Sequence, residues 1–307
     1  MALKRTATWL VFAGTAAIAA VAVADALRPH EDVRPQARAA GRPGTAELLR
    51  RAGIRGGILT LAGPDCSTRQ VAMPSFSSII ASRPPIACGG RVWDPTRTVA
   101  ARCRDRRVTL LGFGGESPEW RGCAPAWRPS GFLTFVRDGA VVEAEPLDCV
   151  RRCTHTLLSR ADLARELAGR VPDADSYGVA ELAWMSSSRF AAVLRGRKPW
   201  QEAIAVFTPP RLLVLRPAFG QRLSGLRASP RGHVAALRSE LGRDAVLFAA
   251  DGRELPLPRI ANVRAIAFSP STRWIALATR TAIFIARTGE VDVIARLPIA
   301  VRALTWE

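Results

Sequence analysis

The sequence predicts an all-β protein, a six-bladed β-propeller of four-stranded antiparallel blades. The first observation is a run of four short apolar segments separated by turn residues: Val263–Phe268, Trp274–Thr279, Ala282–Arg287 and Val291–Leu297. Segments of this length joined by tight turns are typical of a small antiparallel meander. The second observation is that the start of this pattern, an apolar pair followed by a Ser/Pro-type turn and another apolar run, recurs along the chain. The third is the spacing of these recurrences, because a repeat of roughly 40 residues is typical of a propeller blade.

Six anchor residues mark these recurrences, and each is expected to end the innermost strand of a blade. They are Trp93, Trp127, Trp184, Ala228, Phe268 and Trp306. The position numbers of consecutive anchors differ by 34, 57, 44, 40 and 38. A β-sandwich with accidental spacing is the alternative, but a series of six matches favours the propeller.

The last anchor predicts how the ring closes. Val301–Trp306 matches an innermost strand, whereas Ile58–Leu61 matches a second strand that has no inner strand before it. A propeller joins its last blade to its first, because open sheet edges invite aggregation. We therefore expect these two segments to pair. The C-terminal strand would then complete a blade whose other three strands come from the N-terminal side.

The longest interval between anchors contains a helical pattern in residues 159–170. Ser159 is suited to cap the first turn, and Leu163 with Leu167 forms an apolar i,i+4 pair. We expect one helical insertion here, packed on a face or rim of the ring. A lid or a partner-binding element is the alternative role for this helix.

Residues 1–56 are expected to lie outside the propeller, which spans residues 57–307. Two basic residues precede the uncharged, mildly apolar run of residues 7–24, which predicts either a cleaved signal peptide or an uncleaved membrane anchor within residues 1–24. Residues 25–56 are Arg- and Pro-rich and are expected to form a linker, with one helical turn at Thr45–Arg51. Export would make the domain extracytoplasmic, either secreted or anchored on the outer side of the cytoplasmic membrane. If it is not cleaved, the segment of residues 7–24 would associate with the membrane.

The six cysteines are expected to form three disulfide bonds in the oxidising environment outside the cytoplasm. In a four-stranded meander, the loop after the second strand and the loop after the fourth lie on the same face of the ring. Cysteines in these two loops of one unit can therefore pair. This predicts the pairs Cys66–Cys88 and Cys103–Cys123, which leaves Cys149–Cys153.

Residues of catalytic or metal-binding types are few and dispersed. Cys149, Cys153 and His155 form a C-x3-C-x-H fragment, but the fourth ligand and usual spacing of a zinc site are missing. The sequence contains no nucleophile elbow, HExxH motif, P-loop or Ca²⁺ loop. We expect no catalytic, cofactor-binding or metal-binding residues, no cofactor, and a non-enzymatic function. The alternative is a propeller-class enzyme acting on a sugar or lactone, which would gather three or more carboxylates or histidines at the channel.

The formal net charge of +18 is the difference between 44 basic and 26 acidic residues, and only Lys4 and Lys198 of the basic residues are lysines. Abundant arginine together with abundant alanine indicates the coding bias of a high-GC genome. The arginines are scattered at turns and strand ends, with no basic helix and no stripe that alternates basic and aromatic residues, so nucleic acid is not an expected partner. Non-specific attraction to an anionic surface is compatible with this charge. We expect a monomer.

The turns that follow the anchors resemble those of the TolB-type and WD-repeat β-propeller family. They read AWRPSG, ASPRG and AFSPST. The family's usual Asp-Gly is replaced here by Ser-Gly, Arg-Gly or Ser-Thr. The resemblance covers roughly residues 57–307. It implies a six-bladed ring and a scaffold role in binding a protein or another cell-envelope component.

Overall fold

The computed structural model describes residues 44–63, 67–79, 87–88, 91–112, 118–145, 153–218, 220–239 and 243–307. The chain divides into two units, Met1–Arg42 and Pro43–Glu307. The predicted signal peptide or anchor, residues 1–24, lies outside the described residues, as does most of the predicted linker. Within the described residues, no helix is both long enough and apolar enough to cross a membrane.

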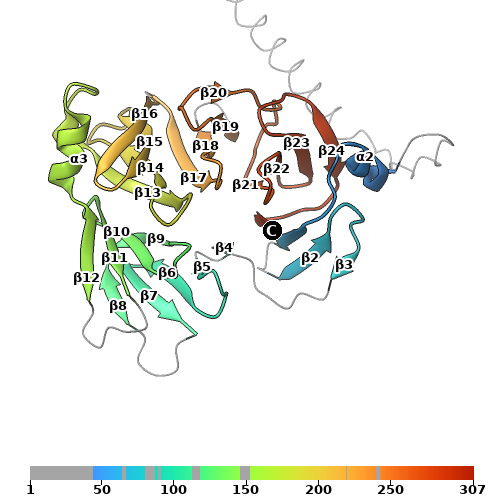
Figure 1. The fold of residues 1–307 in the computed structure, drawn as a ribbon, viewed down its shortest axis with the longest axis horizontal. Coiled ribbons are helices and arrows are strands. Elements are labelled where there is room, and N and C mark those ends of the chain that lie inside the picture. The colour runs from blue at the N-terminus through green and yellow to red at the C-terminus, as the bar shows by residue number, and fades with distance from the viewer. Residues whose placement is uncertain are drawn as a thin grey trace, which may run out of the picture. The chain divides into compact units, whose positions relative to one another are not determined.

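The described strands of the second unit form six antiparallel sheets, which are the blades of a propeller (Figure 1). Blade one contains β25 (Ala303–Trp306), β1 (Ile58–Ala62), β2 (Thr68–Ala72) and β3 (Ser78–Ile79). Blade two contains β4 (Ala87–Cys88), β5 (Arg91–Trp93), β6 (Ala100–Arg104), β7 (Arg107–Leu111) and β8 (Glu119–Arg121). Blade three contains β9 (Cys123–Trp127), β10 (Leu133–Arg137), β11 (Ala140–Ala144) and β12 (Thr154–Leu158).

The other three blades follow the same order along the chain. Blade four contains β13 (Gly178–Trp184), β14 (Phe190–Arg195), β15 (Glu202–Thr208) and β16 (Arg211–Pro217). Blade five contains β17 (Arg222–Ala228), β18 (Val234–Ser239), β19 (Arg243–Phe248) and β20 (Glu254–Leu255). Blade six contains β21 (Ala265–Phe268), β22 (Trp274–Ala278), β23 (Ile283–Arg287) and β24 (Val293–Leu297). The predicted six-bladed, four-stranded architecture is confirmed, and blade two carries the additional short strand β4.

All six anchor residues end the strands that contact one another from blade to blade. These strands are β5, β9, β13, β17, β21 and β25. Contacts join each of them to the next in this order, and β4 of blade two contacts β25 of blade one. The interval between anchors therefore measures one step around the ring, as predicted.

The ring closes as the sequence predicts, because β25 pairs with β1. The antiparallel register places Leu59 opposite Trp306 and Ala62 opposite Ala303. The backbones continue to bond beyond the ladder: the Ile58 amide donates to the Glu307 carbonyl at 2.6 Å, and the Glu307 amide donates back at 2.9 Å. Blade one thus combines one strand from the C-terminal side with three from the N-terminal side.

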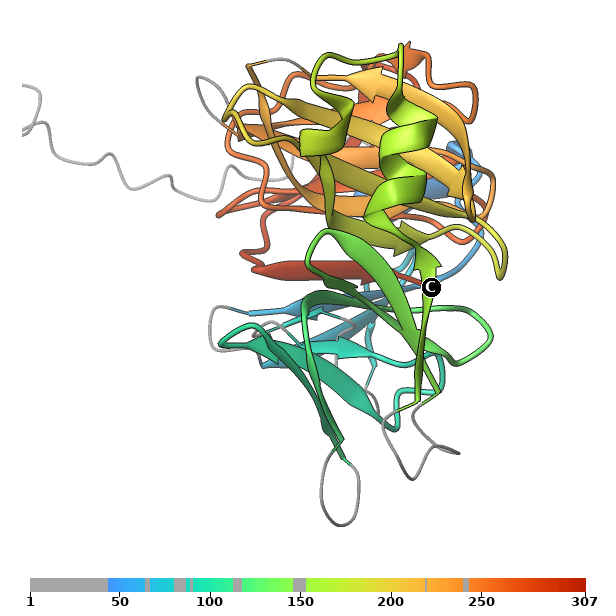
Figure 2. The same cartoon turned by 90° about the vertical axis from the view of Figure 1, so that its left-hand side faces the viewer.

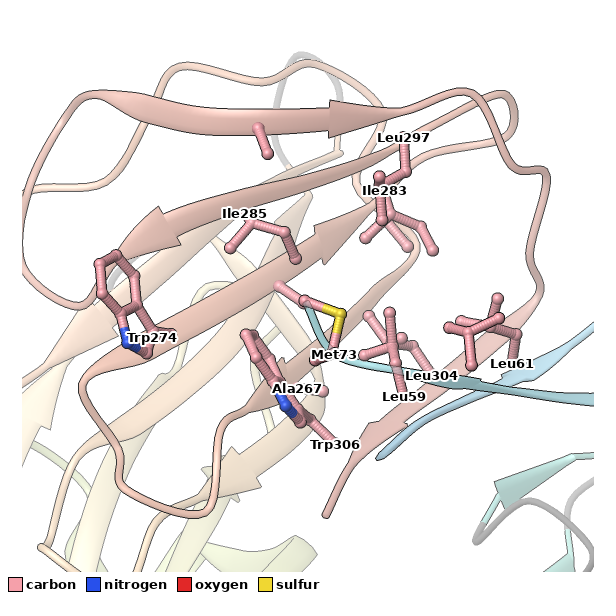
Figure 3. Packing of buried hydrophobic residues seen from close by; sticks show 14 of the residues in the cluster. Leu59, Leu61, Met73, Ala267, Trp274, Ile283, Ile285, Leu297, Leu304 and Trp306 are labelled. Carbon is pink, nitrogen blue, oxygen red and sulfur yellow. The ribbon is translucent and has the colours of Figure 1, made fainter. Parts of the chain in front are cut away.

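The hydrophobic core is divided into clusters between and within adjacent blades. The cluster at blades six and one contains Trp274 and Trp306, each only 6 % exposed, together with side chains from β1, β23 and β24 (Figure 3). Alanines such as Ala267, Ala276 and Ala278 lie in the same cluster. Their small side chains leave room for the two indoles, which explains why alanine-rich strands pack closely here.

The predicted helical insertion is α3 (Arg160–Leu167), which lies against blade four (Figure 2). Ser159 forms a capping box with Asp162, because each side chain accepts a hydrogen bond from the other residue's backbone amide. Leu163 and Leu167 are fully buried in the cluster of blades three and four. Glu166 accepts a 3.0 Å hydrogen bond from the backbone amide of Leu212, on the edge strand β16. These contacts favour a packed structural element over a lid.

A second helix, α2 (Thr45–Arg51), occupies the position of the expected helical turn. Leu49 of this helix is fully buried and Ile54 just after it is 2 % exposed, both in the cluster of blades six and one. The helix contacts β24. Residues 44–56, at the end of the predicted linker, therefore pack on the propeller. The burial of two apolar side chains, Leu49 and Ile54, holds this otherwise polar segment in place.

The predicted Cys103–Cys123 disulfide is confirmed, with Cα atoms 5.1 Å apart. Cys103 lies in β6 and Cys123 begins β9, so the bond joins blades two and three rather than two strands of one unit. The sequence placed Cys123 just before the inner strand, whereas the structure includes it in that strand. Cys153 is also disulfide-bonded. Cys66 and Cys149 lie outside the described residues, and the side chain of Cys88 is likewise not described.

Candidate functional site

The most deeply buried carboxylate of blade three, Glu143, is held by two partners. Its side chain is 3 % exposed, and it lies 2.9 Å from Arg128 Nη1 and 3.0 Å from His155 Nε2. His155 sits directly across the ladder from Glu143 in β12. In the structure, the histidine of the C-x3-C-x-H fragment therefore contacts a carboxylate. Cys153 of the same fragment is disulfide-bonded.

Arg128 extends this pairing to the next blade. Its guanidinium carbon lies 5.0 Å from the centre of the Trp184 ring in blade four, a cation–π geometry. Its Nε donates to the Ser187 carbonyl in the β13–β14 turn. The charge of Glu143 is thus used to fasten blade three to blade four.

A second buried carboxylate fastens blade four to blade five. Glu202 has a side chain 4 % exposed, and it accepts from Arg195 Nε at 2.9 Å and from the backbone amide of Leu223 at 2.5 Å. Glu181 on β13 accepts from the backbone amide of Leu226 on β17 at 3.2 Å. Carboxylates that accept hydrogen bonds from backbone amides of a neighbouring blade have a structural role. They provide acceptors for N–H groups that the packing of the blades shields from water.

One hollow lies between blades four and five. It has a volume of about 470 Å³ and three arginines in its lining, Arg216, Arg238 and Arg253. Arg238 binds Asp244 in a bidentate pair at 3.1 and 2.7 Å, and Arg216 Nε donates to the Gly252 carbonyl. Two of its three guanidiniums are therefore engaged within the protein.

A larger hollow lies at the seam of blades six and one, and we call it the seam pocket. It has a volume of about 630 Å³. Three segments line it: residues 53–57 between α2 and β1, the β21–β22 turn with the start of β22, and the last residues of the chain, Trp306 and Glu307. The second segment contributes Ser269, Pro270, Ser271, Arg273 and Trp274. Arg55 and Arg273 are exposed at this pocket, and the indoles of Trp274 and Trp306 form part of its wall.

The seam pocket is the candidate binding site, and the sequence did not single out its arginines. Ser269, Pro270 and Arg273 belong to a turn that the repeat identified, but only as a structural signal. Residues 53–56 were assigned to the linker. The two stretches come together because β25 pairs with β1, which the sequence did predict. In the described part of the chain, His, Cys, Asp and Glu form no group of three or more that could hold a metal ion.

Comparisons with known proteins give a structural likeness and no match in sequence. No protein-family model and no curated protein matches the chain. Among solved structures, the chain is similar to the β-propeller domain of Myceliophteria thermophila Cps50 (Swd1), with a TM-score of 0.49 and 10% sequence identity. The alignment covers 78% of this chain and 83% of that one.

Proposed function

We propose that this protein is an exported, non-enzymatic β-propeller that acts as a binding scaffold for a protein or another cell-envelope component. The observation that carries the proposal is the seam pocket, where two exposed arginines stand beside two tryptophans on a closed ring. A concave site that combines apolar walls with a few polar groups is the usual form of a binding site.

The roles of the carboxylates at the blade boundaries support a scaffold rather than a catalyst. Glu143, Glu181 and Glu202 each bind side chains or backbone amides that join neighbouring blades. Their charges are therefore used to hold the ring in one shape. A preformed rigid surface reduces the entropy lost on binding, which favours recognition of a partner.

The disulfide and the N-terminal sequence support export. Disulfides persist in oxidising compartments outside the cytoplasm, and Cys103–Cys123 joins two blades covalently. Residues 1–24 carry the pattern of a signal peptide or anchor. Both features are consistent with a domain that works in the cell envelope.

Two measurements test this function. A reporter enzyme that is active only outside the cytoplasm, fused after Glu307, should be active when residues 1–24 are intact and inactive when they are deleted. Chemical cross-linking of the full chain in its native envelope should produce a discrete adduct of reproducible mass. The proposal is wrong if a second reporter, active only in the cytoplasm, is active when fused to the chain with residues 1–24 intact. It is also wrong if cross-linking yields only the unmodified chain.

A further inference from the structure

We propose that the seam pocket binds a carboxylate of an acidic peptide segment in the partner protein, an inference that rests on the proposed binding function. The structure offers three independent observations for it. They are the shape of the seam, the charge at its rim, and a buried hydrogen-bond donor in its wall that has no acceptor.

The pocket lies at a place where blade one differs from its neighbour. In blade six a short turn, residues 269–273, joins β21 directly to β22. The corresponding strands of blade one are β25 and β1, which come from distant parts of the chain, so no hairpin turn joins them. The pocket is lined by the turn of blade six and by the adjoining ends of these two strands.

The rim of the seam pocket carries positive charge that the described residues do not neutralise. Arg55 and Arg273 are both exposed, and within the described ranges neither guanidinium has a carboxylate partner. The one acidic side chain in the lining, Glu307, forms an ion pair with Arg97, whose side chain is only 5 % exposed. The unpaired charged side chains of the lining are thus cationic and suit an anion.

The wall of the pocket contains the donor that lacks an acceptor. Trp306 is 6 % exposed, and its Nε1 has no hydrogen-bond partner in the part of the chain that the structure describes. By contrast, Trp127 Nε1 and Trp184 Nε1 each donate at 2.8 Å to the preceding blade. A buried unpaired N–H is unfavourable, so a ligand oxygen that reaches it is favoured.

Two glycines, Gly56 and Gly57, lie next to this donor. A Cβ on Gly57 would lie 2.7 Å from Trp306 Nε1, whereas a Cβ on Gly56 would meet nothing within 4 Å. Gly57 also has a φ of +119°, which side-chain-bearing residues rarely adopt. The backbone of Gly57 therefore lies against the indole N–H, and a ligand oxygen accepts from this donor only when residues 56–57 move aside.

The chemistry of the lining favours a peptide carboxylate over a sugar. The free polar groups of the side chains are donors, namely two guanidiniums and an indole N–H, whereas a neutral sugar also needs acceptors. The hydroxyl of Ser269 already accepts from the Trp274 amide at 3.1 Å. Apolar surface from the exposed Pro270 lies beside the charges, which suits an aliphatic side chain next to a glutamate or aspartate. An acidic polysaccharide offers the charge without that apolar neighbour.

The test uses a fluorescein-labelled peptide of alternating glutamate and leucine, titrated with the purified full chain and followed by polarisation. The double variant R55E/R273E should bind the peptide at least about tenfold more weakly than the wild type, because it replaces two charge-assisted contacts by repulsion. W306F, which keeps an aromatic ring but removes the N–H, should also bind more weakly. The matched control is R231E, because Arg231 is exposed in the equivalent turn of blade five; it should bind as the wild type does.

Three results would overturn the inference: unchanged binding by R55E/R273E, equal binding of a peptide with glutamine in place of glutamate, or equal competition by an oligomer of galacturonic acid. If R55E/R273E does not fold by circular dichroism, the milder R273Q replaces it with the same expected direction. The native-envelope cross-link separates the two proposals. An adduct that R55E/R273E retains contradicts the seam pocket alone, whereas no adduct even for the wild type contradicts the binding function.

Discussion

The indole Nε1–H of Trp184 in blade four donates a 2.8 Å hydrogen bond to Oγ1 of Thr134 in blade three. Thr134 is fully buried, and its hydroxyl in turn donates a 2.7 Å hydrogen bond to the Ala126 carbonyl. Trp127 makes the corresponding contact one blade earlier, with the Val92 carbonyl. The anchor residues Trp127 and Trp184 therefore each join their blade to the one before it by a hydrogen bond.

Replacing Trp184 by Phe should destabilise the protein more than replacing Trp306 by Phe. Both changes remove the same atoms, but only W184F breaks a hydrogen bond and leaves a buried hydroxyl with one partner fewer. The expected difference is about 1 kcal/mol in the free energy of unfolding, measured by urea denaturation. Equal loss in the two variants would contradict a stabilising role for the Trp184–Thr134 bond.

Glu143→Gln should destabilise the ring by about 1–3 kcal/mol. The substitution removes the negative charge of a buried carboxylate and so weakens its interactions with Arg128 and His155. The matched control is Glu119→Gln, which disrupts the 3.0 Å Arg107–Glu119 pair, whose arginine side chain is 64% exposed. That exposed pair should contribute about 0–1 kcal/mol. Thermal unfolding of both variants measures the contrast, and a control as costly as E143Q would contradict it.

Stability should fall as the pH drops through the ordinary histidine range, partly because of His233. Burial lowers the pKa of His233 in the folded protein, and nearby Arg231 lowers it further. The unfolded chain therefore takes up a proton at a higher pH than the folded chain, so acidification favours unfolding. This contribution is fully present above the unfolded pKa and is lost as the pH falls toward the folded pKa.

The variant H233Q isolates this effect. Its unfolding free energy should decline less steeply than that of the wild type from about pH 7 to pH 5, the range in which an ordinary histidine titrates. Urea midpoints measured across this range supply the comparison. Parallel profiles for the two proteins would show that His233 does not contribute.

Removing the bond between blades two and three should also lower stability. The cysteines are 20 residues apart in sequence, and a loop of that length contributes about 3 kcal/mol in the chain-entropy model. The double variant C103A/C123A should show this loss in urea. An unchanged midpoint would mean that the disulfide does not restrain the unfolded chain.

Deleting residues 301–307 should abolish the closed ring. The deletion removes β25, leaves the edge of β1 unpaired and takes Trp306 out of the core. Loss of a buried tryptophan side chain alone costs about 3–5 kcal/mol, a large share of the stability of a typical domain. We expect a much lower melting temperature or aggregation, while an unchanged melting temperature would contradict closure through β25.

Local patterns in the sequence were sufficient for the architecture. The six anchors, the cap at Ser159 and the pairing of β25 with β1 follow from turn residues, short-range periodicity and the need to pair every inner strand. Each of these signals lies within one blade or at its boundary. They could therefore be read without knowing which residues face one another across the ring.

Only the tertiary structure decided which side chains meet between blades. Arg128 reaches Trp184, and Arg97 reaches Glu307. Arg55 and Arg273 likewise share one pocket although they lie near opposite ends of the described chain. Such contacts depend on the twist and tilt of each sheet and on the rotamer of each side chain. The pattern of residues along the sequence predicts the order of the blades. It does not predict the twist, tilt and side-chain rotamers that set these distances.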